Sequence, residues 1–145
     1  MCFKGYLERH GWKVVSIDKW RRGNPYDPRD VRFVDLELDL VDMSRFADGT
    51  FDLVIAQHVI EEVPEYRQAL DEIRRVVQPG GLALLEIPFD RRRERSQPQP
   101  PDRFGNVWRF GIDLPDEVDA RFDAVEAHEL REGDYRGEVM ACQVH

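Results

Sequence analysis

The sequence contains no long hydrophobic run, and this absence restricts where the chain can reside. No apolar stretch approaches the roughly 20 residues that a membrane-spanning helix needs. The opening residues MCFKGYLERHG lack the apolar core of a signal peptide. We therefore expect a cytoplasmic protein without a membrane partner.

Cysteine and positive charge are also scarce. Cys2 and Cys142 are the two cysteines and the four histidines are scattered, so the sequence predicts neither a disulfide framework nor a metal site. The 21 Lys and Arg residues against 29 Asp and Glu residues give a net charge of -8, which disfavours a surface for the phosphate backbone of nucleic acid. Within these limits, 145 residues with a hydrophobic share of 41% predict one globular domain over residues 1–145.

Predicted strands and helices alternate along the chain. Apolar residues three and four positions apart indicate helices over 3–11, 65–78 and 114–122. Apolar or alternating runs indicate strands over 12–18, 31–40, 51–60, 82–89, 123–130 and 139–145. Because strands that alternate with helices form parallel sheets, the pattern predicts an α/β fold, and the last two strands are close enough in sequence to form an antiparallel hairpin.

Two segments of this pattern are distinctive. The helix in EYRQALDEIRRVVQPGG ends at its proline and glycines and presents one apolar stripe, formed by Tyr66, Leu70, Ile73, Val76 and Val77. The stretch 90–104, DRRRERSQPQPPDRF, is rich in proline and arginine and predicts a long, exposed and mobile loop. Runs of arginine such as this one are usually solvated rather than part of a binding site.

The acids at strand ends are the first candidates for a ligand site, because ligands of parallel α/β sheets bind beyond the carboxyl ends of the strands. Asp18 ends one predicted strand, and a carboxylate there can accept hydrogen bonds from both hydroxyls of a ribose. Asp39, followed by Leu40, ends the next strand and can accept a hydrogen bond from the exocyclic amine of a purine. Three neighbouring acids compete with it for this role: Asp35, Glu37 and Asp42. For each position an ordinary surface acid is the alternative.

A longer pattern connects these residues. VSID, followed by ADGTFDLVIAQHVIEEVPEYRQALDEIRRVVQPGGLALLEIPFD, resembles the class I S-adenosylmethionine-dependent methyltransferases of the methyltransferase domain 11 kind, from about residue 6 to residue 90. The resemblance implies a three-layer Rossmann-like sheet, mostly parallel with a C-terminal antiparallel hairpin, and transfer of a methyl group from S-adenosylmethionine to a small molecule. It also implies that Asp18 holds the ribose, that Asp39 and Leu40 meet the adenine, and that Gln57 and His58 line the methionine part and the methyl-transfer channel.

The sequence departs from this family in two places. The family often has Glu-His where this chain has Glu61-Glu62. The family's first strand and its glycine-rich turn, which cradle the cofactor, have no counterpart before Asp18, and Gly5 has no companion glycine. We interpret the chain either as an N-terminally incomplete domain or as a naturally shortened one that lost catalysis or completes its sheet as a homodimer. On either interpretation we expect weak cofactor binding or none.

His58 is the candidate catalytic residue, with an ordinary histidine at the rim of the core as the alternative. Arg91, Trp108 and Arg109 are candidates for binding the methyl acceptor, because arginine suits a carboxylate or phosphate, although Trp108 could equally pack on the sheet. Since proximity and orientation supply much of the acceleration of methyl transfer, a missing base does not exclude activity. The main alternative function is a non-catalytic methyltransferase-like module that binds a partner or regulates it; a nicotinamide-dependent oxidoreductase fits less well.

Overall fold

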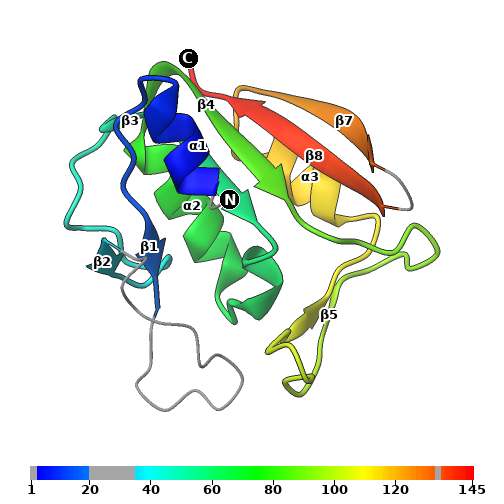
Figure 1. Ribbon diagram of the computed structural model, residues 1–145. Helices are drawn as coiled ribbons and strands as arrows, with labels where there is room; N and C mark the ends of the chain where they lie inside the picture. Colours follow the sequence, from blue (N-terminus) through cyan, green and yellow to red (C-terminus); the bar gives the residue numbers. More distant parts are fainter. Residues whose placement is uncertain (1–2, 20–34, 133–134) are drawn as a thin grey trace. The chain divides into compact units, whose positions relative to one another are not determined.

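The computed structural model describes residues 3–19, 35–132 and 135–145. They belong to two compact units, of which the first ends at Leu40 and the second begins at Val41 (Figure 1). The single domain predicted over residues 1–145 therefore stays a prediction. Cys2 and the start of the strand predicted over 31–40 lie outside the described residues. No helix in the described ranges has the length and apolar character needed to cross a lipid bilayer.

The first unit contains one helix and a pair of short parallel strands. Helix α1, Phe3–Arg9, is followed by Gly11 with a φ of 89°, a left-handed conformation that suits the glycine predicted to stop this helix. Strand β1, Ile17–Asp18, pairs in parallel with β2, Leu36–Glu37. Strand β1 is shorter than the strand predicted over 12–18, because ladder pairing covers only two of its residues.

The second unit is built on a mixed sheet of four strands in the order β3-β4-β8-β7. Strand β3, Phe51–Gln57, pairs in parallel with β4, Val77–Glu86. Strand β8, Tyr135–Gln143, lies antiparallel between β4 and β7, Ala124–Glu132. The predicted C-terminal hairpin is confirmed by the pairing of β7 with β8.

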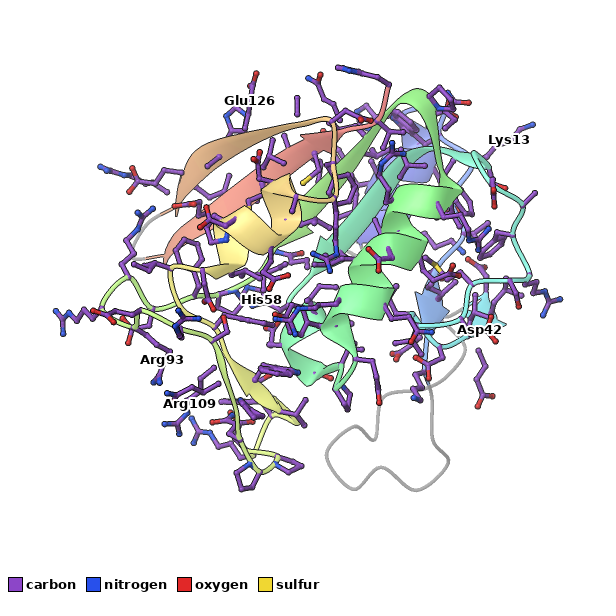
Figure 2. All side chains as sticks on the ribbon, turned by 180° about the vertical axis from the view of Figure 1, so that it is seen from behind. Lys13, Asp42, His58, Arg93, Arg109 and Glu126 are labelled. Carbon is purple, nitrogen blue, oxygen red and sulfur yellow. The ribbon has the colours of Figure 1, made fainter. Side chains whose placement is uncertain are left out.

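Two helices cover the same face of this sheet, as Figures 1 and 2 show from opposite sides. Helix α2, Tyr66–Val76, packs against β4, and α3, Leu114–Asp119, packs against β7. The predicted apolar stripe is confirmed, because all five of its side chains are buried: Tyr66, Leu70, Ile73, Val76 and Val77. Alternate residues of the central strands bury their side chains in the same core: Ala83, Leu85, Met140 and Cys142.

Strand β4 leaves its ladder with β3 at the QPGG segment, which is the segment predicted to stop the preceding helix. Phe51 pairs with Val77, but Leu53 pairs with Leu82, so residues 78–81 are looped out between the two pairs. Gly81 has no room for a side chain, since a Cβ would lie 2.8 Å from the carbonyl oxygen of Gln78 and 2.8 Å from Cγ1 of Val77. The glycine therefore sets where the remainder of β4 rejoins the sheet.

The proline- and arginine-rich segment is more ordered than the sequence predicts. Strand β5, Gln97–Pro98, pairs antiparallel with β6, Trp108–Arg109. Before it, the backbone N–H and the hydroxyl of Ser96 donate to the carboxylate of Asp113. The expectation of an irregular loop from 90 to 104 is thus wrong for Gln97 and Pro98, because residues beyond the proline-rich run supply a pairing strand.

Candidate functional site

A site forms where the two parallel strands of the second unit end. Gln57, the last residue of β3, is the register partner of Glu86, the last residue of β4, and its side-chain amide donates to Oε2 of Glu86 at 2.6 Å. His58 follows directly, with a φ of 50°, and its backbone N–H donates to the carbonyl oxygen of Glu86 at 3.0 Å. Within the described part of the chain, His58 is the only non-glycine residue with a positive φ. Such a conformation costs free energy and is concentrated at functional sites.

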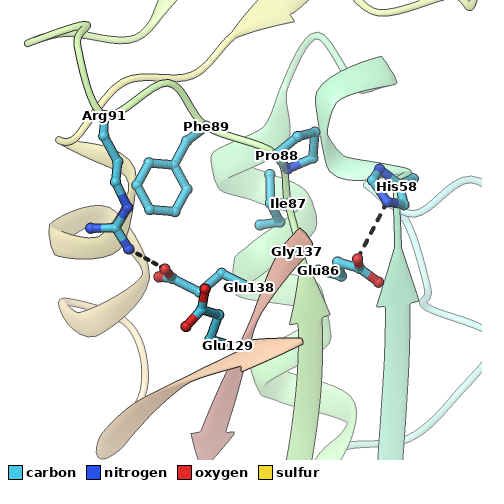
Figure 3. A pocket seen from close by; sticks show the side chains of 9 residues that line it. All are labelled: His58, Glu86, Ile87, Pro88, Phe89, Arg91, Glu129, Gly137 and Glu138. Carbon is cyan, nitrogen blue, oxygen red and sulfur yellow. Dashed lines mark hydrogen bonds and ion pairs between the residues drawn. The ribbon is translucent and has the colours of Figure 1, made fainter. Parts of the chain in front are cut away.

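The ring of His58 lies between two buried carboxylates. Its Nδ1 is 3.4 Å from Oε1 of Glu61, and its Nε2 is 3.5 Å from Oε1 of Glu86. Glu61 and Glu86 are 4% and 5% exposed, whereas the side chain of His58 is 47% exposed. One imidazole thus connects two carboxylates removed from water with a surface that a ligand can reach, and Figure 3 shows its contact with Glu86.

Glu61 reaches this position through the short 3-10 helix η2, Ile60–Glu62, which directly follows the turn at His58 and Val59. The backbone carbonyl oxygen of Glu61 accepts a hydrogen bond from the N–H of Val107. Its side-chain Oε2 is buried and has no hydrogen-bond partner among the described residues. Burial raises the pKa of Glu61 above its ordinary value, and the nearby His58 lowers it by less.

An open hollow of about 550 Å³ lies beside this cluster. Figure 3 shows its lining, which comes from the end of β3, from β4 and the segment after it, and from the β7–β8 hairpin: His58, Glu86, Ile87, Pro88, Phe89, Arg91, Glu129, Gly137 and Glu138. Arg91 forms an ion pair with Glu138 at the rim, and its guanidinium lies 5.4 Å from the centre of the Phe89 ring. The hollow therefore offers one aromatic face, a histidine and several carboxylates to a small molecule.

Some of the predicted site residues of the second unit lie at the hollow and others do not. His58 and Arg91 line the hollow, and Gln57 holds one of its carboxylates. Trp108 instead donates from Nε1 to the carbonyl oxygen of Pro64 at 3.0 Å and packs in an aromatic cluster with Tyr66 and Phe110. This is the packing role given above as its alternative.

Arg109 lies away from this cluster, since its guanidinium donates to the side chain of Gln99. Neither Trp108 nor Arg109 belongs to the lining of the hollow. The acceptor role predicted for these two residues therefore stays a prediction.

The acids predicted for ribose and adenine lie in the first unit. Asp18 ends β1 and is exposed, and Asp39 forms an ion pair with Lys19. The competitor Asp35 is engaged in other contacts, because Lys4 and the backbone N–H and hydroxyl of Ser16 all donate to its carboxylate. The hydrogen bond from Lys4 is the largest cause that lowers the pKa of Asp35 to about 2.

The two remaining competitors are also placed. Glu37 is the register partner of Asp18 in the β1–β2 pair, and Asp42, in the second unit, accepts a hydrogen bond from the N–H of Ser44 at 3.1 Å. Asp18 and Asp39 belong to the first unit, and Gln57 and His58 belong to the second.

Sequence reasoning missed the carboxylates of the site. Glu86 could have been found, because it is the one charged residue in the apolar run LALLEIPF. Glu61 could not, since it stands beside Glu62 in VIEEV and nothing in that pattern tells which acid is buried. The described residues contain no cluster of three or more His, Cys, Asp or Glu side chains that is arranged to hold a metal ion.

Known methyltransferases resemble this chain in sequence. A family model described as a methyltransferase domain matches residues 3–85, which confirms the resemblance drawn from the sequence. Demethylmenaquinone methyltransferase of Thermus thermophilus is 38% identical over 81 residues, which cover 55% of this chain and 31% of that protein. The chain therefore corresponds to about a third of the length of this curated relative.

Solved structures show the fold. The 1,6-didemethyltoxoflavin-N1-methyltransferase of Burkholderia thailandensis, with bound 1,6-didemethyltoxoflavin and S-adenosylhomocysteine, aligns with a TM-score of 0.70 and 12% identity over 98% of this chain and 66% of that chain. The PH0226 protein of Pyrococcus horikoshii aligns with a TM-score of 0.62 and 23% identity over 99% of this chain and 76% of that chain. The predicted Rossmann-like methyltransferase fold is thus confirmed.

Proposed function

Because this chain belongs to the methyltransferase domain family, we propose that it serves the transfer of a methyl group from S-adenosylmethionine to a small-molecule acceptor. The observation that carries the proposal is the ring of His58 between Glu61 and Glu86, beside a hollow at the carboxyl ends of two parallel strands. Ligands of α/β sheets bind at this edge. The volume of about 550 Å³ is within the usual range for small-molecule sites.

The donor chemistry of the described residues fits part of the cofactor. Asp18, exposed at the end of β1, can accept hydrogen bonds from both ribose hydroxyls, and Asp39 and Leu40 would meet the adenine. Asp39 would share its carboxylate between the adenine amine and Lys19. In the second unit, Gln57 and the carboxylate of Glu86 suit the positively charged methionine part.

The chain's own residues supply orientation and proton transfer. When bound, S-adenosylmethionine would supply the methyl group and a neutral thioether as the leaving group. His58 is the catalytic residue that we assign: its exposed ring faces the hollow and takes a proton from the acceptor. The walls of the hollow would hold the acceptor beside His58 when the cofactor is bound, and such proximity and orientation supply much of the acceleration.

The affinity for the cofactor is expected to be low in a protein of these 145 residues. The segment before Asp18 contains no glycine-rich turn whose backbone N–H groups could bind the methionine part. Each missing hydrogen bond to a charged group costs about 1 to 3 kcal/mol, so three of them weaken binding on the order of a thousandfold. Completion of the sheet in a homodimer, the absence of nucleic-acid and membrane partners, and the cytoplasmic location stay predictions.

Calorimetry tests the proposal directly. Titration of the 145-residue protein with S-adenosylmethionine and S-adenosylhomocysteine should give weak, saturable binding, and Asp18→Asn should weaken it about tenfold by removing a charged acceptor of ribose hydroxyls. Asp116→Asn, which changes an exposed acid of α3, is the matched control and should leave binding unchanged. Saturable binding of either compound would count against the non-catalytic module, whereas absence of binding at millimolar concentration would favour that module over an enzyme.

Transfer itself is measured with labelled S-adenosylmethionine. Demethylmenaquinone, named in the relative from Thermus thermophilus, is the first acceptor to supply. Label should move to the organic phase with the wild-type protein and not with His58→Asn. Equal transfer by both proteins would remove His58 from the catalytic role.

A further inference from the structure

The carboxylate of Glu61 has no evident role in holding the fold together. Its side chain is buried, one oxygen has no partner among the described residues, and the other oxygen lies 3.4 Å from Nδ1 of His58. A buried and incompletely bonded carboxylate costs stability, whereas an apolar side chain would suit the core beside the buried Ile60. Apart from its own backbone N–H, the carboxylate contacts the histidine ring.

We propose that Glu61 is a positioning residue for His58, an inference that rests on the proposed function. In this arrangement Nδ1 carries the hydrogen of the neutral ring and donates it to Oε1 of Glu61. The lone pair is then on Nε2, the nitrogen beside Glu86, which lines the hollow. A carboxylate that selects the tautomer of a histidine base, and stabilises the imidazolium formed later, is an established device in catalysis.

Each methyl transfer moves one proton from the acceptor, forms one bond to the methyl carbon and breaks another. The acceptor loses its X–H proton to Nε2 of His58 as its X atom forms a bond to the methyl carbon, and the bond between that carbon and sulfur breaks with its electron pair staying on sulfur. His58 is then an imidazolium whose Nδ1–H faces Glu61 and whose Nε2–H faces Glu86. Gln57 holds the other oxygen of Glu86, so that carboxylate keeps its place. Release of the proton to water restores His58.

Glu61 also makes the fold sensitive to pH in a definite direction. The titratable groups that act on it are His58, at the end of β3, and Glu86, at the end of β4. Burial raises the pKa of Glu61, so the native state binds a proton that the unfolded chain has already lost, and stability falls as the pH rises from the ordinary pKa through the raised one. Glu61→Gln removes this loss.

The first test reads the tautomer of His58 and needs no acceptor. Long-range proton–nitrogen NMR spectra, recorded where the ring is neutral, should show Nδ1–H in the wild type and in Glu61→Gln, whose amide oxygen can still accept. Glu61→Leu should shift the ring toward Nε2–H, because the substitution removes the acceptor at Nδ1 while Oε1 of Glu86 still faces Nε2. A wild-type ring in the Nε2–H form, or a ring that Glu61→Leu leaves unchanged, would overturn the proposal.

The second test separates a functional role from a structural one. Glu61→Gln should unfold at a higher temperature than the wild type at about pH 8, with a smaller difference at about pH 4, while kcat falls about 10- to 100-fold and KM changes little. Glu65→Gln is the matched control, since this exposed acid at the start of α2 makes no capping bond, and it should change neither quantity. A variant that is less stable at both pH values would assign Glu61 to the fold instead. If the wild type binds no cofactor, the proposed function fails, but the tautomer and the pH dependence still decide the role of Glu61.

Discussion

Nε2 of Gln57 lies 2.6 Å from Oε2 of Glu86, so a side-chain amide joins the carboxyl ends of two neighbouring parallel strands. The amide is a donor, and the buried carboxylate that it meets accepts. The carboxylate of Glu86 thus meets Gln57 through one oxygen and the ring of His58 through the other.

Gln57→Glu should convert this contact into a pH-dependent weakness. Two carboxylates at that separation cannot both ionise, so the native state would retain a proton that the unfolded chain loses. We therefore expect the melting temperature of the variant to fall between about pH 5 and pH 8, and to fall more than that of the wild type. Gln143→Glu adds the same charge at an exposed position at the end of β8 and should lack this trend. Parallel curves for the variant and the wild type would contradict the expectation.

The left-handed backbone at His58 predicts that two substitutions there affect the unfolding free energy differently. Asn tolerates a φ of 50°, so His58→Asn should unfold at nearly the wild-type urea concentration. A β-branched residue is strained there, so His58→Val should lose about 1 to 3 kcal/mol of unfolding free energy. Both variants should lose methyl transfer. Equal stability of the two would show that this turn is relaxed in solution.

Arg75 anchors α2 to the segment before β3. Its guanidinium donates to Glu72 and Asp48 and to the carbonyl oxygens of Met43 and Phe46. Arg75→Met leaves these acceptors without their donor, so we expect a loss of about 2 to 4 kcal/mol in urea unfolding, as several charged hydrogen bonds go together. Arg92→Met, at an exposed position, is the control and should change stability by less than about 0.5 kcal/mol. A similar effect of both changes would show that the Arg75 contacts are replaced by water.

Gly81 should tolerate no side chain. A Cβ at this position would lie 2.8 Å from Cγ1 of Val77 and 3.0 Å from the carbonyl oxygen of Asp52, so Gly81→Ala must shift β4. We expect a loss of about 1 to 3 kcal/mol in unfolding free energy. Gly5→Ala, in α1 with open space around it, should be neutral or stabilising by up to about 1 kcal/mol. Wild-type stability of Gly81→Ala would mean that the looped-out residues adjust freely.

The ion pair between Arg91 and Glu138 should govern acceptor choice rather than stability. Arg91 is largely exposed, and such pairs contribute little to folding, so Arg91→Ala should keep the wild-type melting temperature. Loss of the Arg91 side chain opens the rim of the hollow. The KM for the acceptor should therefore change several-fold, while the affinity for S-adenosylhomocysteine stays the same. Arg92→Ala is the neighbouring control. An unchanged acceptor KM would place the specificity elsewhere.

Single substitutions test the role of residues 91–101 in acceptor binding better than a deletion would, because a deletion would also remove contacts that hold the fold. Loss of residues 91–101 would take away β5 and the bonds from Ser96 to Asp113, which hold the chain next to α3. Its effect on the acceptor could then not be separated from an effect on folding.

Much of the fold could be predicted because it depends on local periodicity. The stripe from Tyr66 to Val76 has the spacing of a helix face, and the apolar run before Gln57 has the character of a buried strand. The strand end also identified His58 as a residue to consider. These features require only the pattern of neighbouring residues and the rule that ligands gather at strand ends.

The rest of the site depends on contacts that no local pattern contains. Glu61 is buried because the left-handed turn at His58 and the short η2 helix direct it inward. Arg91 meets Glu138 because of the antiparallel register of β8 against β4, across 47 positions of sequence. The pairing of β5 with β6 likewise depended on residues beyond the proline-rich run. Tertiary register, rather than propensity, determines these contacts.

The place of β8 in the sheet has a consequence for synthesis on the ribosome. Residues 135–143 lie between β4 and β7, so each of these earlier strands acquires its β8 partner only after that segment has emerged. Until then the hydrogen-bonding edge of β4 that β8 will cover is exposed, and an unpaired edge invites association with other chains. Nascent chains halted before residue 135 should therefore recruit chaperones and be cut readily by proteases, whereas chains released with β8 complete should resist both.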